Sequence, residues 1–158
     1  FNLFGANSII PSVQPTHATS DMYWAGDRVG SDRVKGAYAY NQLLQQNGWM
    51  PLGTDFPVED ISTFKTFYAA VVRKNAKGWS AEGCQMENAL TREQTLRCMT
   101  IWAAESNFKK KKKGSLEKGK LADFIILDTD IMKEAPDKIL TIKVLKTFVG
   151  GEKVYEKK

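Results

Sequence analysis

Trp49-Met-Pro-Leu-Gly-Thr-Asp-Phe-Pro-Val58 is a short apolar run that ends on a carboxylate and then turns. Two small residues, Gly53 and Thr54, precede Asp55, and Pro57 follows it closely. A parallel α/β barrel presents catalytic groups in this way, at the carboxyl end of a buried strand with a turn beyond it. An Asp before a turn is also common for purely local reasons, so the motif alone leaves both interpretations open.

The segments on both sides of this run alternate between strand and helix patterns. Residues 9–13 are typical of a short strand that enters a loop carrying His17 and Trp24. We expect a helix over residues 32–47 and another from about Ser62, each with apolar residues at helical spacing. With a strand at residues 49–54, the order strand, helix, strand, helix predicts a parallel α/β fold.

The C-terminal part of the chain has a different sequence pattern, in which one helix is followed by strands. Thr91-Arg-Glu-Gln94 predicts a capping box, with a helix continuing to about Ala103 and ending at the run Lys109 to Lys113. Residues 123–127 predict a buried strand, and residues 142–149 a second one. Gly150-Gly151 then predicts a tight hairpin into a last strand.

Composition indicates a globular chain with a core of its own. The 158 residues are 42% hydrophobic and 26% charged, and no run approaches the roughly 20 apolar residues that span a bilayer. Two cysteines are too few for a disulfide framework or a four-ligand zinc site, so we expect Cys98 to be a small core residue. Because the chain begins at Phe1 without Met or a basic leader, we expect it to be part of a longer protein, with its compartment unknown and the cytoplasm as default.

The net charge of +5 comes wholly from the C-terminal third. Residues 1–108 carry 9 Lys+Arg against 10 acids, whereas residues 109–158 carry 14 Lys against 8 acids. A basic run can bind nucleic acid or a membrane surface, but aromatic residues of the kind that stack on bases are not interleaved with it. We therefore favour a solvated helix end and expect neither a nucleic-acid nor a membrane partner. A non-catalytic basic module binding acidic surfaces through residues 109–158 remains the alternative function.

Four segments together resemble one family in their order and spacing. They are Ser12-Val-Gln-Pro-Thr-His-Ala-Thr-Ser-Asp21, Gly53-Thr-Asp-Phe-Pro-Val-Glu59, Thr91-Arg-Glu-Gln-Thr-Leu96 and Gly114-Ser-Leu-Glu-Lys-Gly-Lys-Leu-Ala-Asp123. The chain resembles the C-terminal portion of a metal-dependent amidohydrolase, in the branch that includes N-substituted formamide deformylases. The resemblance covers essentially the whole chain.

The resemblance implies a fold. Members of the family are (β/α)8 barrels with a small β-sandwich assembled from both chain ends. On that basis residues 9–13 resemble barrel strand 7 and residues 49–54 resemble strand 8. We expect residues 1–108 to form the last two β/α units with a following helix, and residues 109–158 to form the C-terminal portion of the sandwich.

The resemblance also implies a divalent metal, for which we expect zinc, and a reaction at a C–N amide-type bond of a small molecule. The family takes its metal ligands from several histidines, a Lys or carboxylate, and the Asp after strand 8, which corresponds to Asp55. This chain holds one histidine, so we expect it to bind no metal and to be inactive by itself, although its parent is a hydrolase.

The candidate site residues are Asp55, His17, Trp24 and Arg33. As a metal ligand and general acid/base, Asp55 would exchange protons with the attacking water and the departing amine. His17 would donate a hydrogen bond to the substrate oxygen, although a lone loop His more often bonds locally. Trp24 would wall the pocket and Arg33 would bind a substrate carboxylate, while loop packing and surface ion pairing are their ordinary alternatives.

In the isolated chain, the segments that resemble strands 7 and 8 would each lack a neighbouring strand on one side. Exposed strand edges template pairing with other chains, so we expect self-association through these edges. A structural half of a two-chain enzyme is a third possible function.

Overall fold

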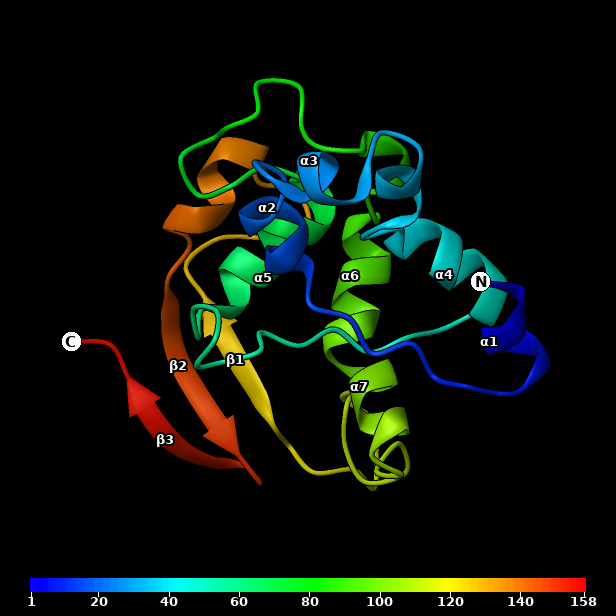
Figure 1. Cartoon of the computed structure of the whole chain (residues 1–158). Helices are drawn as coiled ribbons and strands as arrows, with labels where there is room; N and C mark the ends of the chain where they lie inside the picture. Colours follow the sequence, from blue (N-terminus) through cyan, green and yellow to red (C-terminus); the bar gives the residue numbers. More distant parts are fainter.

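A helical region and a small antiparallel sheet occupy opposite sides of the molecule in a computed structural model that describes residues 1–158 (Figure 1). Helices α6 and α7 run end to end through the middle, and α1 and α4 lie on the side away from the sheet. The helices are α1 (Asn2–Ala6), α2 (Pro15–Ser20), α3 (Ala25–Val29), η1 (Arg33–Gly36), α4 (Tyr40–Asn47), α5 (Thr63–Val72), η2 (Met86–Asn88), α6 (Arg92–Met99), α7 (Ile101–Ser106) and η3 (Pro136–Thr141). The strands are β1 (Phe124–Leu127), β2 (Val144–Val149) and β3 (Glu152–Glu156).

The two apolar runs expected as parallel strands meet in a single parallel bridge between Val13 and Leu52. Val13 N–H donates to the carbonyl of Pro51 at 3.2 Å, and Gly53 N–H donates back to Val13 at 3.0 Å. The expected strands over 9–13 and 49–54 are therefore too long, although their direction is parallel. Pro51 has no N–H to donate, and the N–H of Leu52 donates to Cys98 at 3.2 Å instead of to another strand.

The expected helix over residues 32–47 is interrupted. Its first part is only the 3-10 turn η1, and α4 begins at Tyr40. The break lies at Tyr38, whose φ of 54° is left-handed and whose hydroxyl donates to Asp21 Oδ2 at 2.6 Å. Gly48 ends α4 with a φ of 80°, as the sequence predicts.

The helix that begins after Thr91 has the expected N-terminus and an unexpected end. Thr91 and Gln94 form both bonds of the capping box, which confirms the sequence prediction. The helix breaks at Thr100, where φ is −122° and ψ is −90°, and α7 ends at Ser106. The lysines of residues 109–113 therefore do not end the helix but lie in the following turns, exposed to solvent.

The three strands form an antiparallel sheet in the order β1-β2-β3. Phe124 and Phe148 lie opposite each other in the register and stack with ring centroids 4.5 Å apart. Gly150 and Gly151 join β2 to β3 with φ of 59° and 87°, which confirms the predicted hairpin. The prediction that β1 is buried is wrong for its middle, because Ile125 and Ile126 are 49% and 42% exposed.

The main core lies where α2, α4, α5 and α6 meet behind the parallel bridge. It consists of Ala18, Tyr40, Leu44, Met50, Leu52, Ala70, Leu90 and Cys98. Cys98 is fully buried, as predicted, and burial raises the pKa of its thiol to about 12. No helix has the length and apolarity needed to cross a bilayer.

Candidate functional site

His17 and Asp55 meet beyond the carboxyl ends of the two bridged segments. His17 follows Val13 by four residues and Asp55 follows Leu52 by three, so the parallel bridge directs both toward the same end. His17 Nε2 lies 3.0 Å from Asp55 Oδ2. Because a carboxylate only accepts, this geometry makes Nε2 the protonated, donating nitrogen. The two residues that carry the hydrolytic interpretation of the sequence are thus brought into contact.

Local backbone geometry places each partner. His17 lies on the short helix α2 and not on a loop as expected, because Pro15 occupies the first helical turn, where proline is favoured. Asp55 has a left-handed φ of 60°. Its carbonyl accepts from the backbone N–H groups of Val58 at 2.8 Å and Glu59 at 3.2 Å, which closes a tight turn.

Glu59 is a neighbour of His17 that the sequence reasoning did not single out. Its Oε1 lies 3.6 Å from His17 Nδ1 and accepts a hydrogen bond from Ser20 Oγ at 2.7 Å. The signal that could have found it is its place four residues after Asp55 in a segment with a proline turn. The site is therefore a histidine between two carboxylates of one turn.

A cavity of about 300 Å³ opens beside His17 on the side of α4. Its walls are mostly apolar, with Asp21 as the carboxylate among them. Tyr38, also in the wall, has its pKa raised to about 12 by burial and by its hydrogen bond to Asp21. Tyr38 is consequently a neutral hydrogen-bond donor at physiological pH.

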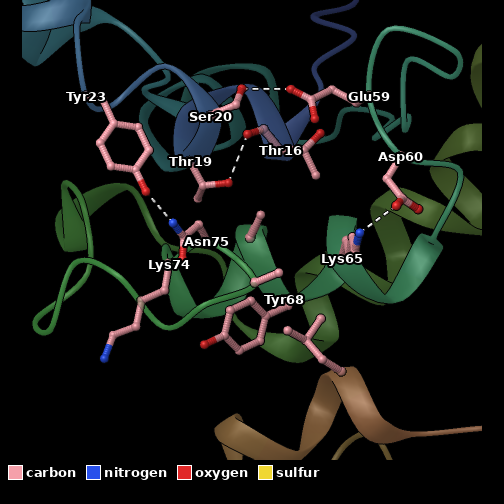
Figure 2. Close-up of a pocket in the computed structure, with 13 residues that line it drawn as sticks. Thr16, Thr19, Ser20, Tyr23, Glu59, Asp60, Lys65, Tyr68, Lys74 and Asn75 are labelled. Atoms are coloured by element: carbon pink, nitrogen blue, oxygen red, sulfur yellow. Dashed lines mark hydrogen bonds and ion pairs between the residues drawn. The ribbon is translucent and has the colours of Figure 1, made fainter.

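A second cavity, of about 380 Å³, lies on the other side of Ser20 and Glu59, between α2 and α5 (Figure 2). Figure 2 shows the Ser20–Glu59 bond on its upper wall and Tyr68 on its floor. Tyr23 forms another part of the wall and stacks on Trp79 with centroids 4.5 Å apart. Two cavities therefore adjoin the site, one lined by His17 and the other by Ser20 and Glu59.

Trp24 and Arg33 are not gathered with His17 and Asp55. Trp24 precedes α3 with 48% of its surface exposed and lines neither of these two cavities. Arg33 is exposed on η1, its side chain forms no hydrogen bond or ion pair, and it lines a separate pocket. Their substrate-binding roles stay predictions.

The donor types at the site suit a divalent metal, but their number is short of a full set. Carboxylate and imidazole are both zinc ligands, and a catalytic zinc takes about three protein ligands. No group of three or more His, Cys, Asp or Glu side chains gathers with the geometry to hold a metal. Asp55 is consequently a candidate for one ligand of such a set.

Solved structures define the class of protein. An uncharacterized metal-dependent hydrolase from Pyrococcus horikoshii OT3 superposes with a TM-score of 0.69 and 32% identity, over 81% of this chain and 26% of that one. An uncharacterized metal-dependent hydrolase from Pyrococcus furiosus gives a TM-score of 0.69 and 28% identity, over 82% of this chain and 25% of that one. The mixed helix and strand fold is that of a segment of metal-dependent hydrolases.

A family model and sequence relatives show which family the chain belongs to. The family model described as "Amidohydrolase family" matches residues 4–155, and the chain belongs to this family. Protein LONG AFTER FAR-RED 3 of Arabidopsis thaliana is 38% identical over 98% of this chain and 26% of its own length. The N-substituted formamide deformylase of Arthrobacter pascens is 31% identical over 85% of this chain and 24% of its own length. The resemblance inferred from the four sequence segments is confirmed, and the chain spans about a quarter of these relatives.

Proposed function

We propose that this chain forms the last part of the active site of a metal-dependent hydrolase that cleaves a C–N bond in a small amide-type substrate. Residues 9–13 and 49–54 would be strands 7 and 8 of its (β/α)8 barrel. Residues 1–108 would belong to the barrel and residues 109–158 to the β-sandwich. Family membership and the direction of the Val13–Leu52 bridge support this arrangement.

The contact between His17 and Asp55 is the observation that carries the proposal. A carboxylate and an imidazole 3.0 Å apart, at the carboxyl end of parallel segments, lie where barrel enzymes place catalytic groups. Both groups are reachable, because 26% of the His17 side chain and 45% of the Asp55 side chain are exposed. Further metal ligands would come from outside these 158 residues.

Each of the two residues has a distinct role in the proposed reaction. A divalent metal, zinc being our first expectation, would lower the pKa of a water molecule to about 7 when bound. Asp55 would be one of its ligands, and its carboxylate would take a proton and return one to the departing amine nitrogen. His17 Nε2–H, which faces Asp55 in this structure, would donate to the substrate oxygen as negative charge develops there.

The test is amine release from N-substituted formamides by the full-length product of the gene that encodes this chain. Asp55→Asn should lower kcat by roughly 10²–10⁴-fold, because an amide cannot accept and return the proton. Asp60→Asn is the matched control, since Asp60 bonds the backbone of Ser62 and the side chain of Lys65, away from His17. An Asp55→Asn enzyme with near wild-type turnover would refute the proposed role.

The same assay tests the proposed dependence on the rest of the protein. We expect no hydrolysis by the 158-residue chain alone, even with added zinc, because the chain offers too few ligands. Turnover by the isolated chain that disappears in Asp55→Asn would show that these residues form a complete site.

A further inference from the structure

His17 has a carboxylate on each side of its ring. Asp55 Oδ2 lies 3.0 Å from Nε2, and Glu59 Oε1 lies 3.6 Å from Nδ1. The second distance is longer than a hydrogen bond, so Glu59 acts on the ring by a close polar contact and by charge. Nε2–H donates to Asp55, and Nδ1 attracts the acceptor-only carboxylate of Glu59 where this nitrogen carries a proton as well.

A ring held at one nitrogen can still pivot about that contact. His17 sits on a two-turn helix with a quarter of its side chain exposed, so packing alone does not fix its χ2 angle. A second polar group on the opposite nitrogen restricts this rotation and determines which nitrogen faces Asp55. Second partners of this kind orient histidines in many enzyme sites.

Glu59 is itself held in two ways. Its carboxylate accepts from Ser20 Oγ at 2.7 Å, and Ser20 lies on the same helix as His17. Its backbone N–H donates to the carbonyl of Asp55 at 3.2 Å, so both carboxylates project from one closed turn. Only a fifth of the Glu59 side chain is exposed. The helix and the turn are thus linked on both sides of the imidazole.

We infer that Glu59, braced by Ser20, is a positioning residue that fixes the His17 ring so that Nε2 faces Asp55. The inference rests on the proposed function only for its catalytic consequence. The orientation of the ring is a property of this chain and can be measured without any turnover.

His17 is the only histidine in the chain, so labelling the protein with ¹³C,¹⁵N-histidine gives the NMR signals of this one ring. In the wild-type chain the ring should approach the rigidity of an ordered backbone, for which the order parameter is about 0.85, and should show contacts to Asp55. Glu59→Ala should lower the order parameter to below about 0.6, because one of the two anchors is lost. Glu59→Gln keeps an acceptor oxygen at the same place and should restore most of the rigidity.

Two further variants make the measurement decisive. Ser20→Ala should loosen the ring to an intermediate degree without removing a charge, and Ser20 is exposed, so folding should tolerate it. Asp60→Ala removes a neighbouring acid that contacts Lys65 and Ser62 and should leave the ring unchanged. The inference is wrong if the ring stays rigid in Glu59→Ala and Ser20→Ala, or if Asp60→Ala loosens it equally.

The catalytic consequence is measured separately in the full-length protein. Glu59→Ala should lower kcat about 10–100-fold with little change in KM, and Glu59→Gln should recover most of the loss. A loosened ring without any hydrolase activity in the wild type would reject the proposed function and leave the positioning role intact. If hydrolysis depends on Asp55 but the order parameter of the His17 ring is unchanged in Glu59→Ala, the positioning role alone is rejected.

Discussion

Gly114 controls how the lysine-rich turn closes against α7. Its φ is +95°, which side chains rarely adopt, and a Cβ there would lie 2.8 Å from Ala104 Cβ and 2.9 Å from Ile101 Cα. The same Cβ would meet the carbonyl oxygen of Thr100 at 3.0 Å. The position therefore needs glycine both for its backbone angle and for the close approach of the helix.

Gly114→Ala should lower the free energy of unfolding by roughly 1–3 kcal/mol more than Gly119→Ala. Gly119 has a similar φ of +91° but nothing within 4 Å of a built Cβ, so it isolates the backbone strain. Urea denaturation of both variants measures the difference. Equal losses would show that close packing at Gly114 has no energetic weight.

Asp55 and Glu59 differ in whether their place in the site could be predicted from the sequence. Asp55 was found from its motif, because a carboxylate after an apolar run has a local signature. The partnership of Glu59 with His17 joins positions 42 apart, and their approach depends on how α2 meets the turn after the bridge. Such contacts are a product of the tertiary fold, and no local pattern encodes them.

Among the helices and strands, the sequence predicted correctly those features that depend only on residues close together in the chain. The capping box of α6 was predicted, and its two bonds are 2.8 and 3.1 Å long. The helix expected over residues 32–47 was partly wrong, because its apolar spacing continues across Tyr38 while Asp21 holds that residue in a non-helical conformation. A side-chain partner from another segment outweighed the periodic pattern.

Thr91→Ala should destabilise the chain by about 1 kcal/mol, because the backbone N–H of Gln94 loses its acceptor. Thr63→Ala is the control: Thr63 is the first residue of α5, is exposed, and forms no side-chain hydrogen bond. Thermal denaturation followed by circular dichroism compares the two. A Thr91→Ala loss no larger than that of Thr63→Ala would mean that the capping box does not stabilise α6.

Considered as a whole molecule, the chain presents several unpaired edges. The segments around Val13 and Leu52 are bridged only to each other. Ile9 and Ile10, just before Val13, are 49% and 37% exposed. Every residue of β3, at the edge of the sheet, is exposed as well. Exposed strand edges are sites at which other chains add strands.

We therefore expect the 158-residue chain to self-associate at concentrations of tens of micromolar, by dimerisation or exchange of segments. Light scattering after gel filtration should give a mass of at least two chains. Ile10→Lys should shift the population toward the monomer, because a lysine at an edge opposes pairing. Ile61→Lys, at an exposed apolar residue in a loop, should not; a strictly monomeric wild type would contradict the expectation.

The central claim is that Asp55 belongs to a metal site whose other ligands lie outside this chain. Elemental mass spectrometry of the purified 158-residue protein after gel filtration measures it directly. We expect less than about 0.1 zinc per chain, because His17 and Asp55 alone provide too few ligands. Close to one tightly held metal per chain, or one per dimer, would contradict it and show that these two residues build a site of their own.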